Sequence, residues 1–353
     1  MNKPSEPSVN ADAFWMQRAL QLAYRSYGTT SPNPPVGAVI IRDGRLLGEG
    51  RHLCAGGPHA ERQALADVYA RGNSEYLRGA TLYVTLEPCS SVGRTPACTD
   101  AILSSGITRV VYGAVDPDKR HQGRADALLR AAGITVCPGV ERPACELLLR
   151  SWAFSVQQGR PWVTAKVATT LDGHLTRRSE RFISTAETLR YAHELRLRSD
   201  AILIGGGTLR HDNPALTIRT PLSPIPVEKK QPWRIVVTRQ PEAVQGRDYR
   251  MFCDAAAERS LVVGPVQDWK ALLQQLHEER GVVNLMLECG GRLLRRLLEE
   301  GLVNEWMQEI APLLSGGKDA VLPGDSFLPQ EFRLQVEQCR NIDGHVLLRG
   351  ILA

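Results

Sequence analysis

The sequence has no apolar run as long as a membrane span, and its first residues, MNKPSEPSVNADAF, contain no apolar segment typical of a secretory signal. It also lacks a run of Lys and Arg with interleaved aromatic residues, which argues against nucleic-acid binding. The net charge of +5 is modest for 353 residues, and it favours solubility and some attraction for phosphorylated metabolites. These absences predict a cytoplasmic protein that acts on small molecules and has no membrane partner.

The length of the chain predicts two domains, because 353 residues are too many for one core of ordinary size. We expect a disordered lead-in over 1–10, a first domain over 11–145, a connecting helix and linker over 146–160, and a second domain over 161–353. Strand and helix patterns alternate in both halves, which predicts an α/β protein with sheets covered by helices. No internal repeat relates the halves.

Local patterns predict the individual elements. Residues 12–27 have helical apolar spacing with Asp12 as N-cap, and β-hairpins are expected to turn at Asp43-Gly44 and Asp343-Gly344. Further helices are predicted over about 59–71, from about 98, and over 125–133, 141–160, 268–280 and 292–301. Further strands are predicted over 80–88, 109–117, 134–140, 161–173, 200–207, 233–239, 260–266, 282–291 and 303–314.

Eight cysteines in a chain without a secretory signal favour metal binding or plain burial over disulfides. His59 and Cys98 each lie where a helix is predicted to begin, and Cys89 follows a predicted strand. The three side chains could therefore meet at a point faced by the positive ends of two helices, and that field favours thiolate over thiol.

One His and two Cys would leave the fourth position of a tetrahedral Zn²⁺ open, as in catalytic zinc sites. Glu61 would then be placed to move a proton from water to a leaving amine. This pattern resembles the H-x-E and P-C parts of the zinc-deaminase signature, although eight residues separate Cys89 from Cys98 instead of two.

Two other interpretations remain open from these residues alone. A deaminase of nucleic acids would act on a flipped base and would show salt-sensitive binding to RNA or single-stranded DNA. A non-catalytic metabolite-binding protein would use zinc only for stability, and it would not need Glu61.

The stretches SPNPPVGAVI, PHAE, TLEPCS and GRTPAC together closely resemble the bifunctional deaminase–reductase family of riboflavin biosynthesis, and the resemblance covers nearly the whole chain. It implies a cytidine-deaminase-like three-layer α/β/α domain followed by a dihydrofolate-reductase-like α/β domain. In that family the first domain deaminates 2,5-diamino-6-ribosylamino-4(3H)-pyrimidinone 5′-phosphate. The second reduces 5-amino-6-(5-phosphoribosylamino)uracil to the ribitylamino product with NADPH.

For the first domain, the resemblance implies that His59, Cys89 and Cys98 hold one Zn²⁺ per chain and that Glu61 is the catalytic proton shuttle. Asn33 would bind the pyrimidine or its ribose, and His52 would lie near that site. This chain departs from the family pattern elsewhere: its residues, with the usual family residue in parentheses, are Ser91 (His), Val92 (His or Tyr), Asp118 (Asn) and Ala125 (Gly).

In the second half, KVATTLDGHLT, SDAILIGGGTLRHDNPALTIR and ECGGRLLRRLL resemble reductase segments of the family. Each is a strand end followed by small residues, which let the backbone approach a dinucleotide closely. The resemblance implies NADPH contacts at Ala168, Thr208, Asp212, Gly290, Gly291, Arg292 and Leu293. It implies substrate contacts at Lys166, Arg196, Leu216, Arg219 and Glu288, and the two arginines are natural partners of a phosphate.

The second half also departs from the family. The loop RRSERFIST is about two residues shorter, and Glu180 stands at a substrate-contact position where Ser is usual. Phe182 stands at a cofactor-contact position where Trp is usual, and Phe can still cover an apolar face. Because of these changes, a deaminase with a degraded or repurposed reductase domain remains an alternative. We hypothesise that Arg239 binds the 2′-phosphate of NADPH, since a guanidinium suits a phosphate. The apolar helix with Trp152 and Phe154 could pack between domains or between subunits, and a homodimer or homotetramer is expected.

Overall fold

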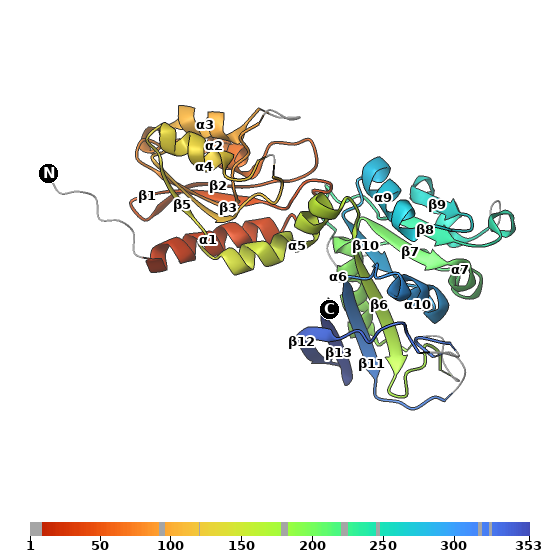
Figure 1. Cartoon of the computed structure of the whole chain (residues 1–353). Coiled ribbons are helices and arrows are strands. Elements are labelled where there is room, and N and C mark those ends of the chain that lie inside the picture. The colour runs from red at the N-terminus through yellow and green to blue at the C-terminus, as the bar shows by residue number, and fades with distance from the viewer. Residues whose placement is uncertain are drawn as a thin grey trace. The chain divides into compact units, whose positions relative to one another are not determined.

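The computed structural model describes residues 9–91, 96–119, 121–177, 183–219, 225–244, 248–316, 320–324 and 327–353. The chain divides into two compact units, Met1–Gln158 and Gly159–Ala353. Figure 1 labels the helices and strands of both units. Among the described residues, no helix combines the length and apolar character needed to cross a membrane.

The first unit is built on a five-stranded sheet in the order β2-β1-β3-β4-β5, in which β3, β4 and β5 are parallel and β1 is antiparallel to both neighbours. Its strands are β1 (Gly37–Arg42), β2 (Arg45–Arg51), β3 (Thr81–Leu86), β4 (Arg109–Ala114) and β5 (Thr135–Pro138). Its helices are α1 (Val9–Tyr24), α2 (Ala60–Ala70), η1 (Ser74–Tyr76), α3 (Cys98–Ser105), α4 (Arg124–Ala131) and α5 (Arg142–Gln158).

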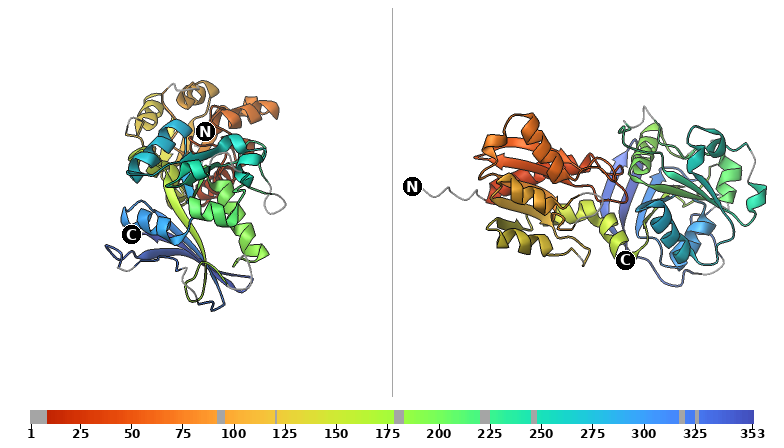
Figure 2. Two further views of the ribbon diagram at one scale, coloured as in Figure 1. Left: turned by 90° about the vertical axis from the view of Figure 1, so that its right-hand side faces the viewer. Right: turned by 90° about the horizontal axis from the view of Figure 1, so that it is seen from above.

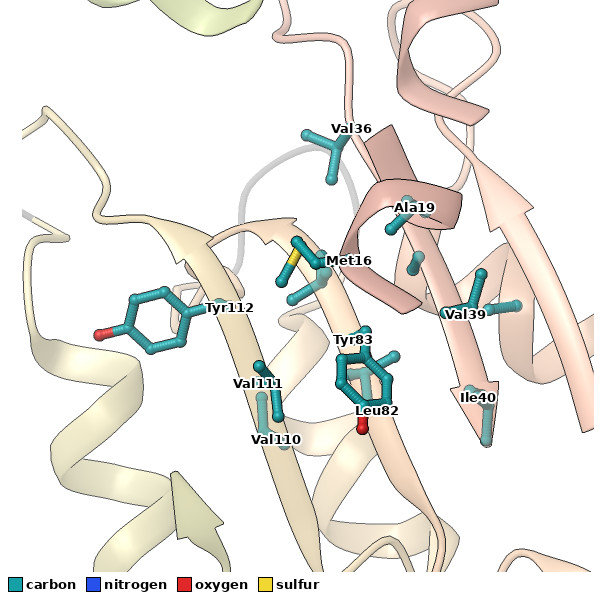
Figure 3. Close-up of a cluster of buried hydrophobic side chains, with 14 of the residues drawn as sticks. Met16, Ala19, Val36, Val39, Ile40, Leu82, Tyr83, Val110, Val111 and Tyr112 are labelled. Carbon is teal, nitrogen blue, oxygen red and sulfur yellow. The ribbon is translucent and has the colours of Figure 1, made fainter. Parts of the chain in front are cut away.

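Helices cover both faces of this sheet: α1 and α5 lie on one face, and α2, α3 and α4 lie on the other (Figure 1). The strands GAVIIR and TLYVTL are therefore buried on both sides, which explains why they are apolar at nearly every position instead of alternating. In Figure 3, Met16 and Ala19 of α1 pack on the face of the sheet that carries Val39, Tyr83 and Val111 of three adjacent strands. The predicted three-layer α/β/α architecture is confirmed.

Two glycines of β2 set the position of α2 on the sheet. A β-carbon added at Gly50 would lie 2.3 Å from the backbone nitrogen of Ala64, and one at Gly48 would lie 2.6 Å from the side chain of Val68. Only residues without a side chain allow the helix to approach this closely. The start of α2, which carries His59 and Glu61, is fixed as a result.

The predicted role of Asp12 as an N-cap is wrong, because α1 begins at Val9 and Asp12 lies in its first turn. Asp12 is buried, and its carboxylate accepts hydrogen bonds from Arg109 at 2.7 Å and from the Tyr83 hydroxyl at 2.7 Å. These partners lie on β4 and β3. The residue therefore ties the helix to the sheet instead of capping it.

The second unit contains an eight-stranded sheet in the order β12-β13-β11-β6-β10-β7-β8-β9, which is parallel from β11 to β9. Its strands are β6 (Trp162–Thr170), β7 (Ala201–Gly205), β8 (Trp233–Val237), β9 (Ser260–Val263), β10 (Asn284–Leu287), β11 (Glu305–Ala311), β12 (Leu334–Ile342) and β13 (His345–Leu352). Its helices are α6 (Ala186–Arg198), α7 (Gly206–Asp212), η2 (Pro241–Ala243), α8 (Arg250–Cys253), η3 (Ala257–Arg259), α9 (Trp269–Arg280) and α10 (Gly291–Glu299).

Alternate residues of the central strands pack into two separate cores, one on each face of the sheet. Leu203 and Leu287 belong to a core with α9 and α10, whereas Ile202 and Met286 belong to a core with α6, α7 and α8. Helices therefore lie on both sides of the sheet (Figure 2), and the central strand β7, AILIG, is apolar throughout for the same reason as in the first unit.

Both predicted hairpins are confirmed, because Asp43-Gly44 joins β1 to β2 and Asp343-Gly344 joins β12 to β13. All four residues have positive φ, as a two-residue type I′ turn requires. The sequence pattern did not predict α6, whose buried face includes Thr188 and His193 beside Ala192 and Leu195. Polar residues on that face obscure its apolar period.

Candidate functional site

Three side chains converge where β3 ends and where α2 and α3 begin. His59 is the N-cap residue of α2, and Cys98 is the first residue of α3. Cys89 follows β3, and its carbonyl accepts the backbone N–H groups of Cys98 and Thr99 at 3.1 and 3.2 Å. Cys89 thus satisfies the first unpaired donors of α3 and is held at the helix start.

The donor atoms have the spacing of a metal site. One ligand atom each from His59, Cys89 and Cys98 lies within 4.8 Å of the others, and Nδ1 of His59 is 3.5 Å from Sγ of Cys89 and 3.4 Å from Sγ of Cys98. Tetrahedral zinc with ordinary bond lengths places sulfur and nitrogen ligands about 3.6 Å apart. The donor chemistry and the separations therefore both fit zinc.

The local field favours charge on one of the two sulfurs. Hydrogen bonding from Cys98, together with His59, lowers the pKa of Cys89 to about 4 against the effect of burial. The same interaction with Cys89, and burial, raise the pKa of Cys98. A cation between the sulfurs would compensate the charge of a second thiolate.

Glu61 lies in the first turn of α2 and is 4% exposed. Burial, and then the charge of Cys89, raise the pKa of its carboxyl group. An acidic group that is held toward its protonated form beside a metal site is suited to both accept and donate a proton.

Asn33 and His52 lie together next to this group. Nδ1 of His52 is 3.0 Å from the Pro58 carbonyl, which can only accept, so Nδ1 carries the proton and Nε2 accepts from Nδ2 of Asn33 at 3.2 Å. Burial lowers the pKa of His52, in keeping with a neutral ring. Its ring centroid is 5.4 Å from that of His59, so the Asn33 amide is oriented close to the zinc-type cluster.

One further residue of this unit escaped the sequence analysis. Glu87 is buried, and its carboxylate accepts backbone N–H groups of Asp116, Gly123 and Ala125 at 3.1–3.3 Å. It ties the end of β3 to the loop after β4 and to the start of α4. An acidic residue at the end of an apolar strand was the available signal.

In the second unit, predicted site residues gather at the carboxyl ends of parallel strands, where open α/β sheets bind ligands. Lys166 and Ala168 lie on β6, Thr208 and Asp212 lie on α7 after β7, and Arg239 follows β8. The remaining ones are Arg196 on α6, Leu216 and Arg219 after α7, Glu288 after β10, and Gly290, Gly291, Arg292 and Leu293 at the start of α10.

Arg196 and Glu288 form a bidentate ion pair. Nε and Nη2 of Arg196 are 2.6 and 2.7 Å from the two carboxylate oxygens of Glu288, and Nη1 donates to the Thr217 carbonyl at 3.1 Å. Burial would raise the pKa of Glu288, but the charge and hydrogen bonds of Arg196 hold it below its usual range. Most of the N–H donors of the Arg196 guanidinium are therefore used in hydrogen bonds within the protein.

Arg219 has a different neighbour, which the sequence analysis also missed. Its Nη2 is 3.2 Å from Nε2 of His193, a buried residue of α6. Burial, followed by the charges of Arg196 and Arg219, lowers the pKa of His193 to about 4, so the ring is neutral and adds no charge of its own beside Arg219. The position of His193 three residues before Arg196 was its only signal.

Two glycine turns offer bare backbone at neighbouring strand ends. A β-carbon added at Gly207 would meet no atom within 4 Å, and one added at Gly290 would meet only the Thr208 hydroxyl, at 4.0 Å. The turns follow β7 and β10, which are adjacent. An open backbone surface next to a hydroxyl fits the close approach of a dinucleotide.

Several predicted site residues are exposed or have an unusual backbone conformation, and others lie outside the residues that the structure describes. The side chain of Asp212 is 44% exposed and pairs with His211, and Arg239 and Arg292 are exposed. Leu216 is buried with φ of +54°, a strained conformation for leucine of the type that is found at ligand sites. Glu180 and Phe182, like residues 92–95, lie outside the described residues.

Comparisons with known proteins assign both units to families. Residues 9–114 match the model of the cytidine and deoxycytidylate deaminase zinc-binding region, and residues 161–348 match that of the RibD C-terminal domain. The chain is 37% identical to riboflavin biosynthesis protein RibD of Aquifex aeolicus, over 86% of this chain and 88% of that protein. It is 35% identical to RibD of Escherichia coli, over 96% of this chain and 98% of that one.

Solved structures agree over the same length. Acinetobacter baumannii RibD matches with a TM-score of 0.88 at 31% identity, covering 98% of this chain and 100% of that one. A Thermotoga maritima diaminohydroxyphosphoribosylaminopyrimidine deaminase/5-amino-6-(5-phosphoribosylamino)uracil reductase matches with a TM-score of 0.86, 31% identity and the same coverage. The chain belongs to the RibD family of riboflavin biosynthesis proteins, which join a deaminase domain and a reductase domain in one polypeptide.

Proposed function

We propose that this chain catalyses two consecutive steps of riboflavin biosynthesis. The first unit deaminates 2,5-diamino-6-ribosylamino-4(3H)-pyrimidinone 5′-phosphate hydrolytically. The second unit reduces 5-amino-6-(5-phosphoribosylamino)uracil to the ribitylamino product with NADPH. The observation that carries the proposal is the convergence of His59, Cys89 and Cys98 around the buried carboxyl group of Glu61.

In the deaminase unit, His59, Cys89 and Cys98 hold one zinc ion per chain. Zinc bound there supplies the charge that makes a neighbouring water molecule acidic enough to act as a nucleophile near neutral pH. Glu61 takes the proton from this water and delivers it to the departing amine, and its raised pKa suits both transfers. Asn33, oriented by the neutral ring of His52, contacts the pyrimidine or its ribose.

In the reductase unit, the nicotinamide of NADPH supplies a hydride for C1′ of the opened ribose. The turns at Gly207 and Gly290, where no side chain blocks access to the backbone, bind the dinucleotide together with the hydroxyl group of Thr208. Arg219 contacts the substrate phosphate, because Nε and Nη2 of Arg196 already donate to the carboxylate of Glu288. Arg196 then acts mainly by fixing Glu288.

A deaminase with a degraded reductase is the weaker alternative, because the RibD C-terminal domain model matches residues 161–348, a range that includes the altered loop. Glu180 and Phe182 remain proposed as a substrate and a cofactor contact, respectively. A homo-oligomer and a cytoplasmic location remain predictions.

One experiment tests the proposal as a whole. The purified chain is incubated with the diaminopyrimidine substrate, with and without NADPH, and products are identified by mass, while metal content per chain is measured by elemental analysis. We expect one zinc per chain, the deaminated product without NADPH, and the ribitylamino product with it. Accumulation of the deaminated product in the presence of NADPH would favour the degraded reductase, and a chain without metal that still deaminates would refute the zinc mechanism.

A further inference from the structure

A buried carboxylate lies beside the proposed reductase site and has no role in it so far. Glu309 is on β11, where it pairs in register with Ala168 of β6, and it is 1% exposed. An acidic side chain this deeply buried is unfavourable unless its charge is compensated. Its surroundings therefore indicate what it does.

Three partners from three other segments surround the Glu309 carboxylate. The Ser184 hydroxyl donates to Oε2 at 2.6 Å, and Nδ1 of His345 is 2.8 Å from Oε1. Nζ of Lys166 lies 3.8 Å from Oε2. Ser184 directly precedes the N-cap of α6, and His345 begins β13, so the carboxylate is fixed from two sides.

The contact with Lys166 differs from the other two. At 3.8 Å the ammonium lies beyond hydrogen-bond length, so the attraction is electrostatic. Glu309 thus holds the position of Lys166 by charge without using its N–H groups, which stay available for an oxygen atom of a ligand.

A second carboxylate competes for the same ammonium. Burial would raise the pKa of Glu288, but Arg196 and also the charge of Lys166 lower it, so Lys166 lies within the field of Glu288 as well. If position 309 were neutral, Lys166 would be drawn toward Glu288 and would compete there with Arg196. The balance between the two carboxylates keeps the cations apart.

We propose that Glu309 is a positioning residue of the reductase: it holds Lys166 away from the Arg196–Glu288 pair so that Lys166 can contact the substrate. The proposal rests on the proposed reductase function. Glu309 itself touches neither substrate nor cofactor, and it acts through Lys166.

The test uses the full chain with the variants Glu309→Gln, Glu309→Asp and Glu305→Gln. Glutamine keeps the size and can still accept from Ser184, but it carries no charge. Glu305 is the matched control, because it is 4% exposed on the same face of β11 and its oxygens bond Arg349, Trp162 and Thr164 instead of Lys166.

We expect Glu309→Gln to raise the KM of the reductase substrate about tenfold with less than a threefold change in kcat, and to leave deamination unchanged. Glu309→Asp keeps the charge and should recover most of the KM, whereas Glu305→Gln should leave it unaltered. An unchanged KM in Glu309→Gln overturns the proposal, as does an equal rise in Glu305→Gln or equal defects in the Asp and Gln variants.

A second measurement does not depend on reductase activity. Acetylation of Lys166 by acetic anhydride is followed by mass spectrometry, with the exposed Lys270 as internal reference. Because Lys166 would leave its position beside Glu309 in Glu309→Gln, its acetylation rate should change at least threefold from the wild-type rate, and Glu305→Gln should match the wild type. If the wild type does not reduce its substrate, the proposed function fails, and an unchanged acetylation rate would separately refute the role of Glu309.

If Glu309→Gln does not fold, the reductase KM and the Lys166 acetylation rate of Glu309→Asp are compared with those of Glu305→Gln. Equal values in these two variants support the charge-based role of Glu309. A defect in Glu309→Asp alone overturns it.

Discussion

The two units assemble their candidate sites differently. In the first, the metal-type ligands and Glu61 come from a short part of the sequence between positions 59 and 98, and each lies where a helix begins or a strand ends. In the second, the clustered side chains come from positions between 166 and 345, on strands brought together by the order of the sheet. The first site depends on a few local structures, and the second depends on the whole fold.

The forces that hold the two sites also differ. Helix starts and close backbone packing at Gly48 and Gly50 fix the first site. Buried ion pairs, Arg196 with Glu288 and Lys166 with Glu309, hold the second. Removing one partner of a buried pair leaves an uncompensated charge. In the second unit we therefore expect single substitutions to change the KM of the substrate. In the first unit we expect them to change the rate of deamination.

The largest effect is expected for Glu61→Gln. Glutamine cannot transfer a proton, so the rate of deamination should fall on the order of 10³-fold. The zinc content measured by elemental analysis should stay the same, and so should NADPH oxidation with the deaminated substrate. The control is Glu75→Gln, an exposed acidic residue of the same unit. Full-speed deamination by Glu61→Gln would mean that another group moves the proton.

The next largest effect is expected for Arg219→Ala in the reductase unit. A charge-assisted hydrogen bond to phosphate contributes about 1.5–3 kcal/mol, so the KM of the reductase substrate should rise roughly 10- to 100-fold with little change in deamination. Arg190→Ala, on the exposed face of α6, is the control. If Arg196→Ala raises KM without disturbing kcat and Arg219→Ala does not, the assignment of the phosphate contact is reversed.

The difference between the units explains how far the sequence could predict them. His59 and Cys98 could be placed at helix starts because Pro58 and the apolar period after Cys98 mark those starts locally. Asp12 was misjudged, because its partners Tyr83 and Arg109 are 71 and 97 residues away and no local pattern reveals them.

The same limit applies more strongly to the second unit. Glu309 meets Ser184 and His345 across 125 and 36 residues, and the contact with His345 depends on the pairing of β11 with β13. Resemblance to a family supplied the residues of this site, whereas the sequence pattern alone supplied only strand ends followed by glycines. The contacts of the buried polar residues His193 and Glu309 became visible only in the folded structure.

A smaller effect, on stability, is expected for Gly50→Ala. Its β-carbon would lie 2.3 Å from the backbone of α2, and overpacking of this kind costs about 1–3 kcal/mol. Deaminase activity should therefore be lost at a lower temperature on heating, whereas reductase activity should persist as in the wild type. Gly264→Ala is the control, because its β-carbon would find its nearest neighbour at 3.9 Å. Equal heat sensitivity of both activities would show that the units do not unfold independently.

The smallest effect is expected for Arg239→Ala, which should lower the preference for NADPH over NADH about tenfold, the value of one charge-assisted hydrogen bond. Arg239 follows β8 next to the turn at Gly206, and kcat/KM for each cofactor measures the preference. Arg210 of α7 is the natural rival, since its Nη1 lies 3.2 Å from a β-carbon added at Gly206. If Arg210→Ala removes the preference and Arg239→Ala does not, the 2′-phosphate is bound by the helix instead of the strand end. Either outcome places cofactor selection in the second unit and should leave deamination unchanged.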